Sequence, residues 1–283
     1  MKKIWSESFL LTETPMQTFV LTPTIDMEEY FNIRYEFDRD KVHKAIDKRL
    51  TAKGSDYICV SDGVVLDSVT RNPTYKDIIN GGMFSICDSS YVPLYLKFLY
   101  GINRGQYTGH EIFQYVVSRK KYRMMFLGTS EHILTPLKEK LVKVDPRIAE
   151  MKFIELPFAE AEDFDYKKIG KLINDDRPDI IWVALGAPKQ ETFMYYLKPY
   201  LEHGVMISVG AVFKFVSGVE AKRAPQWMIK HHLEFVHRIF SEPRKQVKRC
   251  RSIVKTLPGL LMSEYKRKRN NPRMQNQSTK SQP

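Results

Sequence analysis

The sequence predicts an α/β fold, a Rossmann-like and mostly parallel sheet with helices on both faces, followed by a basic helical C-terminal appendage. Three observations predict this fold. Short apolar runs alternate with longer helical segments along the chain, which is typical of βαβ units. Several of these runs end at Gly or Asp, as strands do where the chain turns. The 283 residues, of which 43% are hydrophobic, suffice for one large domain.

Residues 1–29 show no clear period and are expected to form an N-terminal arm. An α/β core, in which glycines mark several turns, is expected over residues 30–218. Strands alternate with helices in its first half. Strands are predicted at residues 30–37, 57–60 and 83–87, and helices at residues 40–53, 73–80, 91–100 and 111–118. Asp38 or Asp40 is the expected cap of the first helix.

The second half of the core continues the alternation. Strands are predicted at residues 122–127, 152–156, 179–185 and 205–209, and helices at residues 131–144 and 166–174. Ser130 is the expected N-cap of the helix that starts at Glu131. Pro136 is expected either to kink this helix or to mark a later start for it. The appendage is expected over residues 219–265, where Pro258-Gly259 argues against one continuous helix. Residues 266–283 are polar and basic, and we expect them to be disordered.

The positive charge of the chain is concentrated at its C-terminal end. The net charge is +12, and residues 244–283 hold twelve Lys and Arg against one Glu, so the rest is close to neutral. Such a tail binds anionic lipid or nucleic acid, or is merely solvated. No run reaches the roughly 18–20 apolar residues of a membrane span. Cys59, Cys87 and Cys250 are far apart, which indicates a reducing compartment and a cytoplasmic protein.

Two motifs place polar groups directly after apolar runs. The first, at residues 181–191, ends in a Gly-Ala-Pro turn followed by Lys189 and Gln190. The second starts at residues 209–213 and continues with these polar and aromatic positions: Lys222 to Trp227, Glu234, Arg238, Glu242, Pro243 and Arg244. Such turns leave backbone N–H groups free at the carboxyl ends of strands, where open α/β sheets bind phosphorylated ligands.

The order and spacing of these motifs, from Asn32 to Lys248, resemble the WecG/TagA/CpsF family of bacterial glycosyltransferases, glycosyltransferase family 26. The resemblance implies an inverting, metal-independent enzyme without a cofactor. It would transfer a hexose or an N-acetylhexosamine, such as N-acetylmannosamine, from a UDP-sugar to a polyprenyl-diphosphate-linked sugar in cell-surface polysaccharide synthesis. Its expected place is the cytoplasmic face of the bacterial inner membrane, with the basic tail on the anionic lipid surface. The sequence leaves the oligomeric state open, a homo-oligomer included.

The resemblance implies that Asp88 is the catalytic base. Asp88 follows the apolar run 83–87 where the family has an Asp-Gly pair, although Ser89 replaces the glycine. An inverting transfer needs a base that takes the proton of the acceptor hydroxyl. The alternative is that Asp88 caps the helix that starts at Tyr91. Asp62 stands where the family usually has an asparagine and is expected to line the same site, but Asp62-Gly63 is also an ordinary turn signal.

The resemblance also implies a set of substrate-binding residues. Thr129, in the turn after the apolar run 122–127, and Gln190 are expected at the UDP moiety. Lys189 is expected to offset diphosphate charge, or else to be a solvated lysine at a helix start. The cations of the appendage that are expected to face the diphosphate are Arg223, Arg238, Arg244, Lys245 and Lys248.

The chain departs from the family pattern at several of these places. Gln106 stands where an arginine is usual, and the nearby Arg104 is the expected substitute. Lys214 replaces an aspartate, which alters sugar selectivity or is harmless if the side chain points outward. Lys245 and Lys248 occupy places that more often hold arginine, so they keep the charge and lose the bidentate fork.

Other patterns point to a metal site or to nucleic acid. His231, His232 and His237 lack the spacing of a helical zinc pair. Two Asp-x-Asp triplets, at residues 38–40 and 163–165, each precede a predicted helix, where Asp is a common cap, so no metal site is expected. The alternative function is a nucleotide- or nucleic-acid-binding protein that uses the basic tail. The nearly neutral body disfavours it, and no specific nucleic acid partner is expected.

Overall fold

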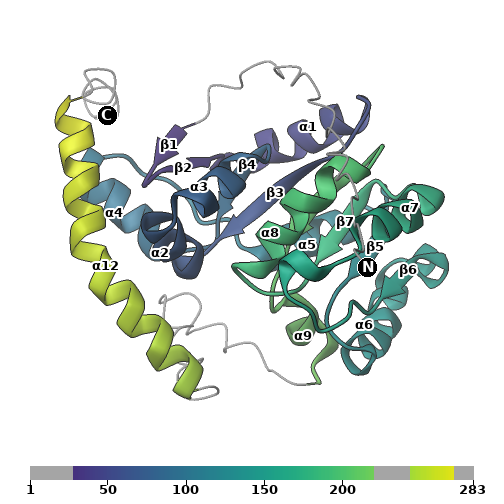
Figure 1. The fold of residues 1–283 in the computed structure, drawn as a ribbon. Helices are drawn as coiled ribbons and strands as arrows, with labels where there is room; N and C mark the ends of the chain where they lie inside the picture. The colour runs from purple at the N-terminus through teal and green to yellow at the C-terminus, as the bar shows by residue number, and fades with distance from the viewer. Residues whose placement is uncertain (1–27, 220–242, 271–283) are drawn as a thin grey trace, which may run out of the picture.

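The computed structural model describes residues 28–219 and 243–270 (Figure 1). Its strands are β1 Glu28–Tyr30, β2 Ile33–Tyr35, β3 Asp56–Ser61, β4 Phe84–Cys87, β5 Met124–Leu127, β6 Lys152–Ile154, β7 Ile180–Val183 and β8 Val205–Ser208. They form one eight-stranded sheet in the order β1-β2-β4-β3-β8-β7-β5-β6. Only β1 and β2 pair in antiparallel orientation among these neighbours. The mostly parallel α/β sheet predicted from the sequence is confirmed.

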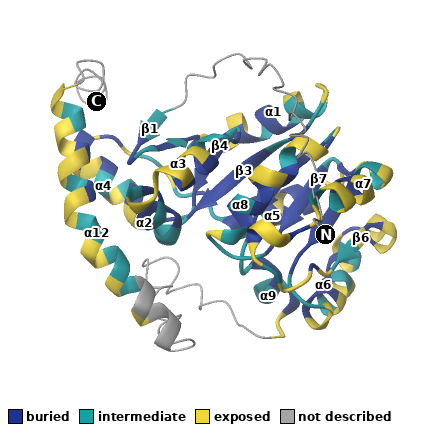
Figure 2. Cartoon of the chain, in the orientation of Figure 1, coloured by how far each residue is buried: buried dark blue, intermediate teal, exposed yellow. Residues whose placement is uncertain are grey.

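Helices cover both faces of this sheet (Figure 2). On one face lie α2 Gly63–Arg71, α3 Pro73–Asn80, α4 Tyr91–Tyr100, α7 Tyr166–Asp176 and α8 Lys189–Leu197. On the other lie α1 Arg39–Leu50, α5 Gly109–Ser118, α6 Glu131–Val144 and α9 Val212–Ser217. Along β3, Tyr57 and Cys59 join the first hydrophobic cluster, whereas Ile58 and Val60 join the second. Burial on both faces explains why the central strands are continuous apolar runs.

Two local features differ from the sequence-based expectation. The single strand predicted at residues 30–37 is wrong, because Phe31 and Asn32 adopt left-handed φ values of 53° and 64° and turn the chain between β1 and β2. A helix that was not predicted, α2, follows β3. Asp62 Oδ1 caps it by accepting hydrogen bonds from Val64 N and Val65 N at 2.8 and 3.0 Å. An Asp-Gly pair is both a turn signal and a helix start, and burial of the apolar side of α2 decides between them.

The C-terminal helix, α12 Pro243–Asn270, is continuous over 28 residues. The predicted break at Pro258-Gly259 is therefore wrong. Both residues lie on the exposed side of the helix, and contacts with the body hold α12 on either side of them. The helix also crosses the boundary expected at residue 265, so residues 266–270 are helical and the predicted disorder is wrong for them.

Two buried carboxylates hold α12 along α2 and α4 (Figure 1). Asp67 of α2 accepts hydrogen bonds from Ser252 Oγ at 2.8 Å and Thr256 Oγ1 at 2.6 Å. Glu264 of α12 accepts from Phe31 N at 3.0 Å and from Tyr100 Oη at 2.6 Å. Each buried charge has several donors, which offset the cost of removing it from water. The described part of the appendage is thus docked on the core rather than separate from it.

Replacing Asp67 by Ala should lower the free energy of unfolding by about 1–3 kcal/mol, because Ser252 and Thr256 lose a buried acceptor. Denaturant unfolding measures this change. Cys250 lies on α12 and is the only one of the three cysteines that is not buried, so its rate of reaction with a thiol reagent should rise when α12 loosens. Asp77→Ala, at an exposed carboxylate of α3, is the control. Equal Cys250 reactivity in the two variants would contradict the anchoring role.

Candidate functional site

The structure brings polar residues from several segments to the carboxyl edge of the sheet. Asp62 follows β3 and Asp88 follows β4, and these two strands end in register, with Ser61 opposite Cys87. Asp88 N donates a hydrogen bond to Ser61 O at 3.0 Å, which places the two aspartates on adjacent strand ends. Ligands of open α/β sheets bind at this edge.

The segment that leads into α5 holds the backbone and the carboxylate of Asp88. Asp88 Oδ1 accepts a hydrogen bond from Gly109 N at 3.2 Å, and Asp88 O accepts one from Gln106 Nε2 at 2.8 Å. Tyr107 N donates to Cys87 O at 2.9 Å, so the whole segment is pinned to the end of β4. Gly109 approaches β3 closely, since a Cβ there would lie 3.2 Å from Val60 Cγ1. The partly exposed Asp88 side chain is therefore oriented by its surroundings.

Asp88 does not cap the helix that follows it. Ser90 occupies the N-cap position of α4, and Ser89 Oγ accepts hydrogen bonds from Tyr91 N and Val92 N at 3.3 and 3.4 Å. The capping alternative for Asp88 is wrong. Asp62, by contrast, does cap a helix, so it has a structural role at the site edge whatever else it contacts.

Arg104 was expected to take the place of the arginine that the family has at position 106, but its side chain is paired elsewhere. Arg104 forms a two-fold ion pair with Glu28 of β1, with Nε 2.8 Å from Oε2, and this pairing raises the pKa of the guanidinium. Another arginine reaches Gln106: Arg39 donates to Gln106 O at 3.0 Å and to Glu111 Oε1 at 2.8 Å. Arg39 was not among the residues predicted at the site, because no local sequence pattern connects it with residue 106.

The turn after β5 is strained. Gly128 has a φ of 102°, and a Cβ there would lie 2.7 Å from Ala184 O, so only glycine fits. Thr129 has a φ of 59°, which is unusual for a β-branched residue and is found most often at functional sites. At the start of α6, Glu131 N donates to Glu155 Oε2 at 3.0 Å. This places Glu155, another residue that was not predicted at the site, beside the turn.

Lys189 and Gln190 begin α8 and point into different surroundings. Lys189 Nζ lies 5.3 Å from the ring centroid of Phe158, which is fully exposed, and 5.5 Å from that of Phe164. Gln190 is only 4% exposed, and its Oε1 accepts hydrogen bonds from Gly186 N at 3.1 Å and Gly210 N at 3.0 Å. The amide of Gln190 thus joins the turn after β7 to the turn after β8. Its contact with a nucleotide stays a prediction.

The cations expected from the appendage are only partly covered by the structure. Arg223 and Arg238 lie outside the described residues, and so do the side chains of Arg244, Lys245 and Lys248, whose backbone opens α12. The part of α12 around Ile253 does lie close to the strand ends. A Cβ on Gly63, at the start of α2 and next to Asp62, would be 3.1 Å from Ile253 Cδ1. Lys214 lies on α9 and is partly buried.

The capping interpretation of the Asp-x-Asp triplets is confirmed at both helices. Asp38 Oδ1 accepts from Asp40 N and Lys41 N at 2.9 and 3.1 Å, and Asp165 Oδ1 accepts from Lys168 N at 3.0 Å. Within residues 28–219 and 243–270, no three His, Cys, Asp or Glu side chains cluster as metal ligands do. His231, His232 and His237 lie outside these ranges.

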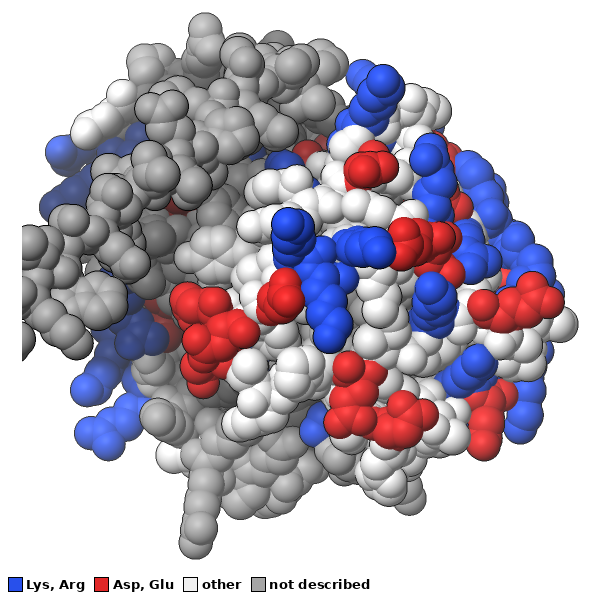
Figure 3. All heavy atoms as spheres, turned by 45° about the vertical axis from the view of Figure 1, so that its right-hand side comes forward, with Lys and Arg blue, Asp and Glu red and all other residues white. Residues whose placement is uncertain are grey.

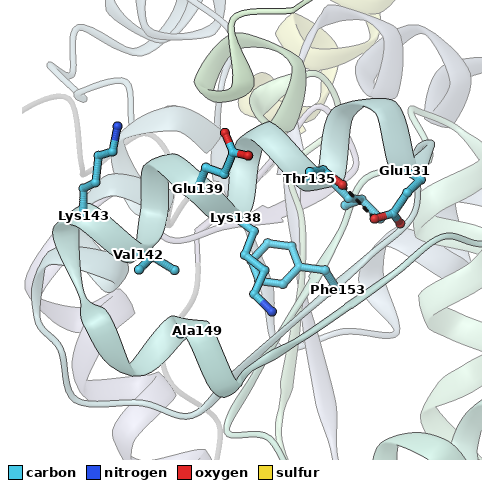
Figure 4. A pocket seen from close by; sticks show the side chains of 9 residues that line it. Glu131, Thr135, Lys138, Glu139, Val142, Lys143, Ala149 and Phe153 are labelled. Atoms are coloured by element: carbon cyan, nitrogen blue, oxygen red, sulfur yellow. Dashed lines mark hydrogen bonds between the residues drawn. The ribbon is translucent and has the colours of Figure 1, made fainter.

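Two cavities lie away from Asp88. One, of about 590 Å³, is lined by α6, the 3₁₀ helix Pro146–Glu150 and β6, and Lys138 Nζ lies 5.5 Å from the Phe153 ring centroid there (Figure 4). None of the predicted site residues lines it. A second, of about 320 Å³, lies between the α2–α3 junction and α8, with Pro188 at its wall.

One face of the body carries mixed charge. On the face that Figure 3 brings forward, Lys and Arg side chains alternate with Asp and Glu in the part that the structure describes. This pattern differs from the basic face of a nucleic-acid-binding protein. Among the described helices, none is long and apolar enough to cross a membrane.

The fold is that of an open, mostly parallel α/β sheet, and its edge residues lie where such sheets generally bind ligands. The sequence matches the family described as glycosyl transferase WecG/TagA/CpsF over residues 30–273. The chain belongs to this family of glycosyltransferases, which confirms the resemblance.

Several curated relatives carry one name, N-acetylglucosaminyldiphosphoundecaprenol N-acetyl-beta-D-mannosaminyltransferase. The relative from Bacillus spizizenii is 26% identical over 198 residues, which cover 69% of this chain and 74% of the relative. That from Bacillus subtilis is 26% identical over 235 residues, which cover 79% and 89%. That from Staphylococcus aureus strain MW2 is 22% identical over 200 residues, which cover 70% and 76%.

Proposed function

We propose that this glycosyltransferase moves an N-acetylmannosamine-like sugar from a UDP-sugar to a polyprenyl-diphosphate-linked sugar, with inversion at the anomeric carbon. The names of the relatives support the acceptor and the sugar. The observation that carries the mechanism is the placement of Asp88: a partly exposed carboxylate, oriented by Gly109 N, at a strand end beside Asp62.

In the proposed reaction, a hydroxyl of the acceptor sugar attacks the anomeric carbon of the donor sugar. The new glycosidic bond forms as the bond from that carbon to the diphosphate oxygen breaks, and UDP leaves. Asp88 takes the proton of the attacking hydroxyl, which a general base must do for the attack to be fast. The strained turn at Gly128 and Thr129, together with Lys189, is the proposed site of the UDP moiety, and the appendage cations Arg223, Arg238, Arg244, Lys245 and Lys248 are proposed to face its diphosphate.

We also propose that the outward face of α12 lies on the anionic membrane surface that holds the lipid-linked acceptor. Ten of the twelve cations counted in residues 244–283 belong to α12, against one buried acid, Glu264. Its exposed side adds four large hydrophobic side chains: Val247, Val254, Met262 and Tyr265. Cations with interleaved apolar groups are typical of helices that lie in a membrane interface. α4, which packs beside α12, exposes 86% of Phe98.

Asp88→Asn should lower turnover by about 10²-fold or more and leave UDP binding intact, because a general base typically contributes about 10²–10⁴-fold. UDP release from a panel of UDP-sugars with a short-chain lipid-diphosphate acceptor measures turnover, and mass spectrometry identifies the product. Asp62→Asn is the matched comparison. Near-normal turnover of Asp88→Asn together with loss of turnover in Asp62→Asn would transfer the role of base to Asp62.

Turnover should persist in excess EDTA. The cap bonds already occupy Asp38 and Asp165, and the chemistry is assigned to Asp88 and to cationic side chains. The assay is the same UDP release, with and without chelator. Complete loss in EDTA that Mg²⁺ or Mn²⁺ restores would show a metal requirement and overturn this part of the proposal.

Charge reversal at Lys255 and Lys266, on the exposed side of α12, should weaken binding to vesicles that contain anionic lipid by about tenfold or more, since each basic residue near such a surface contributes about 1 kcal/mol. Vesicle co-sedimentation at low and high salt measures the effect. Reversal at Lys167 and Lys171 of α7, at the other end of the molecule in Figure 1, is the control. Equal binding by the two double variants would refute the membrane face.

A further inference from the structure

Beneath the carboxyl edge lies a buried carboxylate to which the catalytic proposal gives no role. Glu191, the third residue of α8, is 0% exposed. Its Oε1 accepts a hydrogen bond from Gln190 Nε2 at 2.8 Å, and its Oε2 accepts one from Tyr75 Oη of α3 at 3.0 Å. Both carboxylate oxygens therefore have a donor. A buried carboxyl group is costly without such partners, so its presence here needs a reason beyond packing.

The partner of Glu191 is the residue that joins the two turns. A glutamine amide can present either its oxygen or its nitrogen in a given direction. Glu191 offers an acceptor oxygen, so the NH₂ group of Gln190 must point toward it. Gln190 Oε1 is thereby directed at the two backbone donors, Gly186 N at 3.1 Å and Gly210 N at 3.0 Å. Both glycines have left-handed φ values, 80° and 52°, so these turns depend on specific backbone conformations.

We infer that Glu191 is a positioning residue that fixes the amide orientation of Gln190 and so holds the turns after β7 and β8 in the arrangement that binds the donor. The inference rests on the proposed function for the identity of the donor. The clamp itself, defined as Glu191, Gln190 and the amides of Gly186 and Gly210, rests only on the hydrogen bonds.

The surroundings of Glu191 agree with a positioning role in either charge state. The pKa of Glu191 is raised to about 7, chiefly by burial and also by the charge of Asp62, against the lowering effect of the hydrogen bonds from Gln190 and Tyr75. Burial and then the charge of Glu191 raise the pKa of the Cys59 thiol on β3. Both the ionised and the neutral form of Glu191 have a carboxyl oxygen that can accept a hydrogen bond from Gln190. The clamp requires an acceptor rather than a charge.

Removing the acceptor tests the clamp. Leu resembles Glu in size, and Tyr75→Phe removes the hydroxyl that would otherwise lose its acceptor. The double variant E191L/Y75F should therefore fold, because an apolar replacement of a buried polar group is commonly tolerated. Hydrogen exchange followed by mass spectrometry should show about tenfold faster exchange in the peptides that contain Gly186 and Gly210, with β3 and β5 unchanged.

Two matched variants separate the clamp from simple packing. Y75F alone keeps the bond from Gln190 to Glu191 and should exchange like the wild type. E191Q keeps an acceptor oxygen and should restore slow exchange at both turns. The clamp is refuted if the amides of Gly186 and Gly210 exchange as slowly in E191L/Y75F as in the wild type. It is also refuted if they exchange as fast in E191Q as in E191L/Y75F.

A binding measurement connects the clamp with the donor. Calorimetry with UDP should show about tenfold weaker binding to E191L/Y75F than to Y75F, and the KM for the UDP-sugar should rise by a similar factor while kcat changes less. Unchanged UDP affinity alongside loosened turns would overturn the link to donor binding. If wild-type protein binds no UDP, the proposed donor is wrong, while the exchange experiment still decides whether the clamp exists.

Discussion

The burial of the central strands on both faces is the constraint on which the rest of the structure depends. β3, β5, β7 and β8 are covered by helices on each side and carry almost entirely buried side chains. Polar chemistry is then excluded from the strands and can appear only where they end. The register of parallel neighbours makes these ends coincide, so residues far apart in the sequence, such as Asp62 and Asp88, become adjacent.

A second organising feature is a set of three of the buried carboxylates. Asp67, Glu191 and Glu264 are each nearly inaccessible to solvent, and each accepts hydrogen bonds from other elements. Asp67 and Glu264 fasten α12 to the core, and Glu191 supports the turns at the strand ends. Because an unpaired buried charge is strongly unfavourable, such groups specify which surfaces must meet. The appendage and the turns at the strand ends are thus each held by polar contacts inside the fold.

Local sequence patterns predict the strands and most helices of the core well, since alternation, capping residues and glycine turns are properties of short segments. They predict secondary structure less well where one local motif is compatible with two conformations. Asp62-Gly63 marks either a turn or the start of a helix, and packing of the apolar side of α2 selects the helix. Pro258-Gly259 indicates a break, but contacts of α12 with α2 and α4 on either side of this pair hold the helix together.

The α/β class, the family, the concentration of positive charge at the C-terminal end and the choice of Asp88 as the candidate base all follow from the amino-acid sequence. The partners of individual side chains emerge only once the chain is folded. The tertiary structure pairs Arg104 with Glu28, brings Arg39 to Gln106, and buries Gln190 between two turns with Glu191 beneath it. The physical reason is that hydrogen bonds and ion pairs form between side chains that the sheet brings together, and spacing along the chain does not encode those distances.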